Sequence, residues 1–338
     1  MMEILIIKLG AIGDVLRTTA VLPGLREKYP DCVISWVTKE GSFDILKNNE
    51  YIDKIYLIEE CLKEKFRELN FDLIINFDDE LKACELASSL KAKKIIGAYL
   101  KNNQRVYSEY SSLWFDMGLI SRFGKRRADE LKALNKETYQ SILFKILNIE
   151  NKNYAPQLNL QNEDLKFSKA FAENNDIGRK DLIIGINTGA GGRWQDKKLS
   201  IEKTAELIQK LGNGVKDKKL ILFGGPEEEE RNKEILEKSD EKIIDAGCNN
   251  SLMEFASLVN LCKILITSDS LAMHIGIALK KKVVAFFGPT SAAEIEIYGR
   301  GKKIVPKKGC LCCYKEICDI TPEYDIDEIV GGVKGLIK

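Results

Sequence analysis

Short runs of Ile, Leu and Val recur along the chain and alternate with longer stretches in which apolar residues repeat every three or four positions. Runs that are apolar at nearly every position are typical of parallel strands buried on both faces, and the longer stretches predict amphipathic helices. This alternation predicts an α/β protein with doubly wound sheets. The predicted strands are residues 3–9, 33–38, 72–77, 94–99, 182–188, 219–224, 242–246, 263–268 and 283–288.

The strand–helix pattern stops in a polar stretch, residues 151–180, and then restarts. A length of 338 residues also favours two domains. We therefore expect an N-terminal domain at 1–165 and a C-terminal domain at 166–338, with the polar, helical segment 100–150 as a candidate substrate-facing part of the first. Two such domains leave a cleft at the carboxyl ends of their strands, where open α/β sheets bind ligands.

The composition narrows the class of protein further. A net charge of +1 does not suggest a nucleic-acid partner, and no apolar run approaches the ~18 residues of a membrane span. The start of the chain has an early Glu3 and no basic segment, which predicts a first core strand and not a signal peptide. Five scattered cysteines fit a reduced, cytoplasmic protein.

Glycine loops follow two of the predicted strands. The first, GAIGD at 10–14, leads into a helix near Asp14, and an Asp there is explained equally by capping of the helix N-terminus. The second, NTGAGG at 187–192, precedes Arg193 and Lys197, and glycine backbone N–H groups with nearby cations can form an anion-binding concavity. A third strand ends before Glu227–Glu230, where carboxylates suit a helix start or a sugar hydroxyl.

The stretch TSDSLAMHIG, residues 267–276, contains His274, the only histidine of the chain. Asp269 and Ser270 end a predicted strand and open a helix, whose first N–H groups are suited to a phosphate. Ser270 and His274 are four residues apart and so share a helix face. A buried histidine without a ligand remains the alternative, and Gly288 ends the next strand nearby.

Four blocks, in this order along nearly the whole chain, resemble the heptosyltransferase family, glycosyltransferase family 9. They are IIKLGAIGDVLRTTAVLPGLREKYP, WVTKEG, NTGAGGRWQDKKLS and SDSLAMHIGIALKKKVVAFFGPT. The resemblance implies the GT-B fold, two Rossmann-like domains facing across a cleft. It also implies an inverting transfer, without metal or other cofactor, of a sugar such as heptose from ADP-heptose to a lipopolysaccharide core or related glycan.

The same resemblance implies roles for individual residues. Asp14 matches the family's general base, and Lys197 matches a lysine that contacts the donor phosphates; these are the candidate catalytic residues. Leu271 stands where the family has Gly, which affects the donor sugar or its pose. The full donor set is Thr188, Gly189, Arg193, Lys197, Asp269, Ser270, Leu271, His274 and Gly288, and the acceptor-side set is Lys8, Gly13 and Arg17.

The implied partners are a nucleotide-diphosphate sugar and a lipid-linked or glycan acceptor, met in the cytoplasm or at the inner-membrane surface. A GT-B module that binds a sugar nucleotide without transfer, or a transferase for another sugar nucleotide, stays open. A nicotinamide oxidoreductase is disfavoured because the first loop lacks the third glycine of a dinucleotide fingerprint. Cys310, Cys312, Cys313 and Cys318 are candidates for a metal site, a disulfide or free structural thiols.

Overall fold

The computed structural model describes residues 1–61, 63–192 and 194–337, and its contacts divide the chain into two compact units. The first unit comprises Met1–Asn159 and Ala293–Glu296, and the second comprises Leu160–Ala292 and the chain from Ile297 onward. Helix α10 (Asn162–Asn174) belongs wholly to the second unit, whereas the expected boundary at 165/166 would cut it. The polar stretch 151–180 therefore contains a regular helix.

A six-stranded sheet forms the centre of the first unit, in the order β3-β2-β1-β4-β5-β6. The four predicted strands are present, with β3 and β6 added to them. β6 pairs antiparallel with β5 through a turn at Asn102 and Asn103, whose φ angles of 51° and 59° suit a tight hairpin. The expectation that 100–150 is helical is therefore wrong at its start. The strands are β1 (Met2–Ile7), β2 (Cys32–Thr38), β3 (Lys54–Leu57), β4 (Asn70–Asn76), β5 (Lys91–Lys101) and β6 (Gln104–Tyr107).

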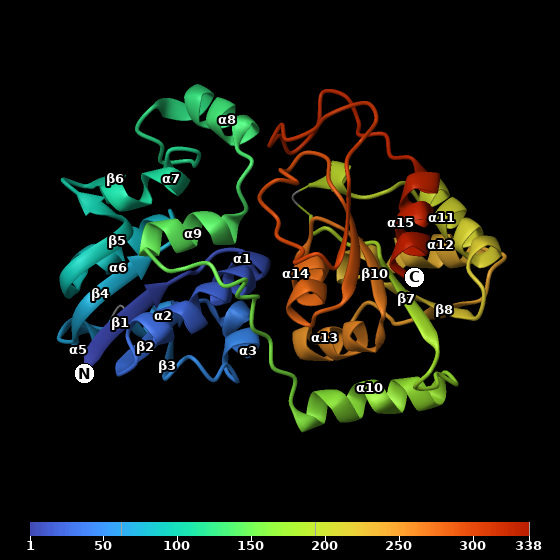
Figure 1. Ribbon diagram of the computed structural model, residues 1–338, viewed down its shortest axis with the longest axis horizontal. Helices are drawn as coiled ribbons and strands as arrows, with labels where there is room; N and C mark the ends of the chain where they lie inside the picture. The colour runs from blue at the N-terminus through green and yellow to red at the C-terminus, as the bar shows by residue number, and fades with distance from the viewer. Residues whose placement is uncertain (62, 193, 338) are drawn as a thin grey trace. The chain divides into compact units, whose positions relative to one another are not determined.

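Helices cover both faces of this sheet (Figure 1). Three of them, α4 (Ile58–Cys61), α5 (Glu64–Arg67) and α6 (Leu81–Ser89), share one hydrophobic core with strands β1, β2 and β4. On the other face lie α1 (Ile12–Thr18), α2 (Leu22–Lys28) and α9 (Tyr139–Leu147). The remaining helices of the unit are α3 (Phe43–Leu46), α7 (Ser112–Phe115) and α8 (Gly124–Leu134).

The second unit repeats the arrangement with a fully parallel sheet in the order β12-β11-β10-β7-β8-β9. The five predicted strands are present, and the sequence pattern missed β12, a short strand with two lysines. The strands are β7 (Leu182–Asn187), β8 (Lys218–Phe223), β9 (Ile243–Asp245), β10 (Ile264–Ser268), β11 (Lys282–Phe286) and β12 (Gly301–Ile304).

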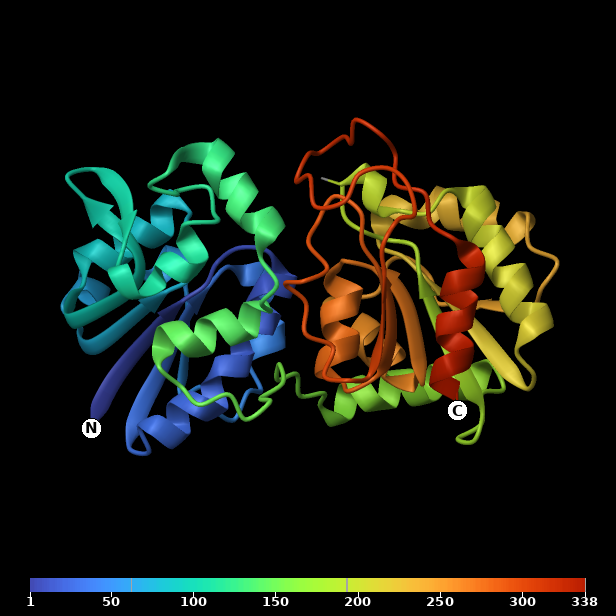
Figure 2. The same cartoon turned by 45° about the horizontal axis from the view of Figure 1, so that its top comes forward.

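The apolar faces of α11 (Ile201–Gly214), α12 (Glu229–Glu237) and α15 (Ile326–Ile337) close a large core against this sheet. Helices α13 (Leu252–Leu261) and α14 (Leu271–Ala278) lie on the opposite face, and α10 packs on α13 (Figures 1 and 2). None of the helices in the described ranges has both the length and the hydropathy needed to cross a bilayer.

The strand orders determine where each unit can bind a ligand. In the first sheet, β2 and β4 flank β1, and in the second, β8 and β10 flank β7. The chain therefore reverses its direction of travel across the sheet beside β1 and beside β7. Connections on the two sides of such a switch point diverge and leave a crevice at the carboxyl ends of the strands. The loops after β1 and β4, and after β7 and β10, are thus the favoured places for function.

Candidate active site

The loop after β1 is held by a buried carboxylate from the neighbouring strand. Asp78, which follows β4, accepts hydrogen bonds from the backbone N–H groups of Leu9 (2.9 Å) and Gly10 (2.8 Å). The Lys8 ammonium lies 3.3 Å from the same carboxylate. Burial alone would raise the pKa of Asp78, but Lys8 and the backbone donors hold its pKa below the ordinary value. The expected acceptor-side residue Lys8 is thus an internal partner that fixes the loop.

Asp14 lies in the first turn of α1 and not at its N-cap, which is Ala11. The capping alternative for Asp14 is therefore wrong, and the helix begins at Ile12, before the expected start. The Asp14 carboxylate forms an ion pair with Arg17, one turn later, at 2.9 Å. The Asp14 side chain is 35% exposed while that of Arg17 is 10% exposed, so the carboxylate keeps access to solvent.

Arg17 is fixed by aromatic packing as well as by Asp14. Its guanidinium lies 4.0 Å from the centroid of the Tyr139 ring, on α9. The Tyr139 hydroxyl in turn lies 2.8 Å from the Thr18 hydroxyl. Gly13, the other expected acceptor-side residue, is buried in α1. The Asp14 carboxylate is therefore oriented beside a buried cation.

In the second unit, the structure brings Lys197 and Asp269 together. The Lys197 ammonium donates to the Asp269 carboxylate at 3.0 Å and to its backbone carbonyl at 2.9 Å. Burial would raise the pKa of Asp269, but the adjacent Lys197 and, to a lesser degree, His274 lower it to about 2. Asp269 is therefore ionised at neutral pH, and a buried ion pair marks the carboxyl end of β10.

Helix α14 starts directly after this pair. Ser270 is its N-cap residue, and the Ser270 hydroxyl lies 3.0 Å from that of Thr267. Leu271 is the first helical residue, and His274 is buried within the helix. The first N–H groups of a helix have no partner within the helix and carry its positive dipole end. The first helical turn contains no acidic residue, and Lys197 lies beside it in its ion pair with Asp269.

The glycine loop after β7 lies beside two glutamates. A side chain at Gly189 would place its Cβ 2.9 Å from Glu228 Oε2, and one at Gly192 would meet Glu227 at 3.2 Å. Glu228 is paired with Lys198 at 2.6 Å, which balances its charge. The anion-binding role of the loop stays a prediction.

Two further donor-side candidates have internal contacts. The Thr188 hydroxyl lies within hydrogen-bond distance of the Phe223 carbonyl oxygen (3.0 Å) and of Asn232 Oδ1 (2.7 Å). A Cβ on Gly288 would lie 2.6 Å from the Tyr324 hydroxyl, which explains the glycine by close packing. Arg193, the remaining candidate, lies outside the described residues.

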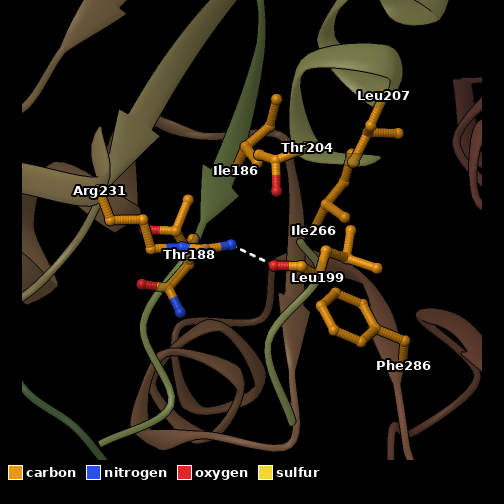
Figure 3. Close-up of a pocket in the computed structure, with 9 residues that line it drawn as sticks. Ile186, Thr188, Leu199, Thr204, Leu207, Arg231, Ile266 and Phe286 are labelled. Atoms are coloured by element: carbon orange, nitrogen blue, oxygen red, sulfur yellow. Dashed lines mark hydrogen bonds between the residues drawn. The ribbon is translucent and has the colours of Figure 1, made fainter. Parts of the chain in front are cut away.

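A small cavity lies beneath the end of β7, lined by Thr188, Leu199 and Arg231 among others (Figure 3). Arg231 crosses it and donates to the backbone carbonyl of Leu199. The cavity has a volume of about 10 Å³, which is at the lower limit for holding a single water molecule. The cavity is therefore an internal packing feature and cannot hold a nucleotide.

The four C-terminal cysteines do not behave as one group. The thiol sulfurs of Cys310, Cys313 and Cys318 all lie within 4.8 Å of one another, and Cys312 is not part of this cluster. All four are free thiols. Cys313 Sγ and Cys318 Sγ are 3.7 Å apart.

Three functional neighbours were not found from the sequence. Asp78 anchors the first loop, and Asn187 donates to the Gly189 carbonyl oxygen at 2.8 Å and to Thr267 Oγ1 at 3.1 Å. Asp196 accepts from the backbone N–H of Cys318 at 2.7 Å. The position of Asp78 and Asn187 directly at strand ends beside the switch points was an available signal. The contact of Asp196 joins segments far apart in the chain, so no local sequence signal indicated it.

The fold defines a protein of two α/β units with a switch point in each sheet, and comparison with known proteins gives the family. The profile of "Glycosyltransferase family 9 (heptosyltransferase)" matches residues 60–322, so the chain belongs to this family and is a glycosyltransferase. The chain is 23% identical, over 328 residues, to lipopolysaccharide heptosyltransferase 1 of Campylobacter coli. That alignment covers 91% of this chain and 92% of the relative.

Solved structures give the same fold. A glycosyltransferase family 9 protein of Veillonella parvula matches with a TM-score of 0.80 at 20% identity, over 99% of this chain and 97% of that one. The Escherichia coli heptosyltransferase WaaC with ADP-2-deoxy-2-fluoro heptose matches with a TM-score of 0.60 at 18% identity, over 99% of each chain. The expected GT-B fold, built of two Rossmann-like units, is thereby confirmed.

Proposed function

We propose that this chain transfers a heptose from ADP-heptose to a lipopolysaccharide core or related glycan, with inversion and without a catalytic metal. The observation that carries the proposal is the start of α14, where the first helix N–H groups lie beside Lys197, whose ammonium a diphosphate would share with Asp269. The WaaC complex with ADP-2-deoxy-2-fluoro heptose suggests the sugar donor. The name of the Campylobacter coli relative, lipopolysaccharide heptosyltransferase 1, suggests the acceptor.

In this mechanism, Asp14 is the general base. Its carboxylate takes the proton of the acceptor hydroxyl as the hydroxyl oxygen forms a bond to the anomeric carbon. The bond from that carbon to the diphosphate oxygen breaks on the opposite face, which inverts the centre and releases ADP. The Arg17 ion pair, at 2.9 Å, keeps the carboxylate oriented. Such base catalysis contributes about 10²–10⁴ to the rate.

Lys197 and the α14 N-terminus stabilise the charge that develops on the leaving diphosphate. Preorganised donors of this kind contribute about 3–4 kcal/mol each in favourable cases. In the described parts of the chain, the one cluster of three or more potential metal ligands is made of cysteines and contains no carboxylate. This supports a charge-stabilising role for Lys197. We further propose that a lipid-linked acceptor reaches the enzyme at a membrane surface.

The decisive variant is Asp14→Asn, assayed for transfer with ADP-heptose and a core acceptor. Asn keeps the size of the side chain but cannot take a proton, so turnover should fall by about 10²–10⁴ with donor affinity unchanged. Asp44→Asn is the matched control, because Asp44 also lies in a first helical turn and pairs with a lysine, Lys47, three residues later. It should retain full turnover.

Two results would contradict the proposal. Turnover above about a tenth of wild type in Asp14→Asn would be too high for a missing base. Stabilisation of the wild type by sugar nucleotides without transfer would instead identify a binding module. A thermal-shift screen separates donors, because a ligand at about 100 times its dissociation constant stabilises by roughly 2.7 kcal/mol. We would attribute a preference for another sugar to the side chain of Leu271, the first residue of α14, which stands where the family has Gly.

A further inference from the structure

The cluster of Cys310, Cys313 and Cys318 has the geometry of a metal site. In a tetrahedral site with zinc–sulfur distances of about 2.3 Å, the sulfurs lie about 3.8 Å apart. The Cys313 and Cys318 sulfurs are 3.7 Å apart, and all three lie within 4.8 Å. A small adjustment of side-chain torsions therefore brings the three sulfurs around one ion.

The backbone turns sharply to bring these sulfurs together. Gly309, Cys312 and Tyr314 have φ angles of 93°, 58° and 51°, in the left-handed region. Two of these residues are not glycine, and such a conformation costs each of them about 1–3 kcal/mol. Interactions of the loop must offset this cost, and Ile317 and Ile320 contribute little apolar packing because they are 78% and 67% exposed.

The charges nearby suit a thiolate site. Lys315, which pairs with Asp319, also lies close enough to Cys310 and Cys313 to interact with both electrostatically. Binding a divalent ion to three thiols releases three protons and leaves one net negative charge, and Lys315 attracts this charge while it remains paired with Asp319. Thiolates select ions such as Zn²⁺, Cu⁺ and iron over Mg²⁺ and Ca²⁺.

We propose that Cys310, Cys313 and Cys318 bind one thiophilic metal ion, with Zn²⁺ as the occupant, and that this ion fixes the 307–323 loop against the donor side of the second unit. Within the described ranges, no fourth Cys, His, Asp or Glu joins the cluster, so the site has three thiolate ligands and one open position. The ion has a structural role: it takes no part in the transfer reaction, and its binding does not depend on which sugar is transferred.

Three hydrogen bonds, each donated by a backbone N–H group of the loop, join it to the segments around the proposed sugar-nucleotide site. The Cys312 N–H donates to the Gly288 carbonyl oxygen at 2.8 Å, and the Tyr314 N–H donates to that of Pro289 at 2.8 Å. The Cys318 N–H donates to the Asp196 carboxylate at 2.7 Å. Asp196 directly precedes Lys197, so an ion that holds these cysteines also holds the segment that carries the phosphate-binding lysine.

The test is metal content and metal affinity of the full-length chain, purified under reducing conditions. Wild type should retain about one equivalent of zinc after gel filtration, as expected for a thiolate site of this kind. Cobalt titrated into the zinc-free chain should give the intense absorption of a tetrahedral thiolate complex. Cys313→Ser should weaken zinc binding by more than about 100-fold, since even the loss of an outer partner costs 10–100-fold.

Cys312→Ser is the matched control, because Cys312 lies in the same loop but outside the cluster. It should bind zinc as the wild type does, and zinc should raise its melting temperature as it does for wild type but not for Cys313→Ser. Equal loss of zinc in Cys312→Ser and Cys313→Ser would overturn the proposal. So would a wild-type chain that binds no zinc while all of its thiols are reduced, or one in which Cys313 and Cys318 form a disulfide.

Discussion

Replacement of Lys197 by Met should destabilise the second unit in a pH-dependent way, because it leaves the Asp269 carboxylate buried without its cation. The two side chains are 10% and 14% exposed and their charged atoms are 3.0 Å apart. The Asp269 pKa is lowered from 3.8 to about 2. At about 1.4 kcal/mol per pH unit, this corresponds to roughly 2 kcal/mol in favour of the ionised, folded form. Removal of one partner of a buried pair costs about 3–5 kcal/mol.

The sign of the pH dependence follows from the direction of the pKa. In wild type, the Asp269 contribution is fully present above pH 3.8 and is lost as the pH falls from 3.8 through about 2. In Lys197→Met, burial is no longer opposed by the lysine, so protonation of Asp269 in the folded chain becomes favourable at a higher pH. The deficit of the variant should therefore be largest near neutral pH and should shrink in mild acid.

Urea unfolding followed by far-ultraviolet circular dichroism at several pH values measures this deficit. A double-mutant cycle with Asp269→Asn isolates the coupling between the two side chains. Lys210→Met is the control, because Lys210 pairs at 2.7 Å with an Asp327 that is 73% exposed, and its loss should leave unfolding nearly unchanged. Additive single-variant effects, with a coupling below about 0.5 kcal/mol, would refute the reasoning.

Three other expectations can be measured directly. Lys197→Ala should raise the donor dissociation constant in calorimetry, and an unchanged constant would remove Lys197 from the phosphate site. Asp78→Ala should lower both turnover and stability, the latter by about 3–5 kcal/mol because Lys8 stays buried without its partner; unchanged urea unfolding would contradict this. Transfer should persist after exchange into EDTA without Mg²⁺ or Mn²⁺. Recovery with Mg²⁺ would contradict metal-independent transfer, whereas recovery with Zn²⁺ alone would implicate the cysteine site.

The sequence by itself determined the α/β class and most of the strands. Runs such as ILII in β1 and ILIT in β10 are buried at every position, because parallel strands covered on both faces need apolar side chains throughout. The strands it missed lie at or near sheet edges. β12 carries two lysines and β6 begins with Gln and Arg, so neither has the continuous apolar pattern. Their pairing depends on the neighbouring strand, which a local pattern does not contain.

The sequence also determined which residues are candidates for function, because strand ends with Gly, Asp, Ser and Lys are recognisable locally. Only the tertiary structure decided their partners. Lys197 and Asp269 are 72 positions apart, and Lys8 and Asp78 are 70 apart, yet the side chains of each pair are hydrogen-bonded to each other. These contacts join loops that follow strands adjacent in the sheet but far apart in the chain, β1 with β4 and β7 with β10, so no short-range pattern encodes them. The carboxylates beside Gly189 come from the segment after the neighbouring strand β8 and became visible only in the folded chain. The C-terminal cysteines are close in sequence, but which three of the four converge depends on the backbone turns of their loop, which the spacing alone does not determine.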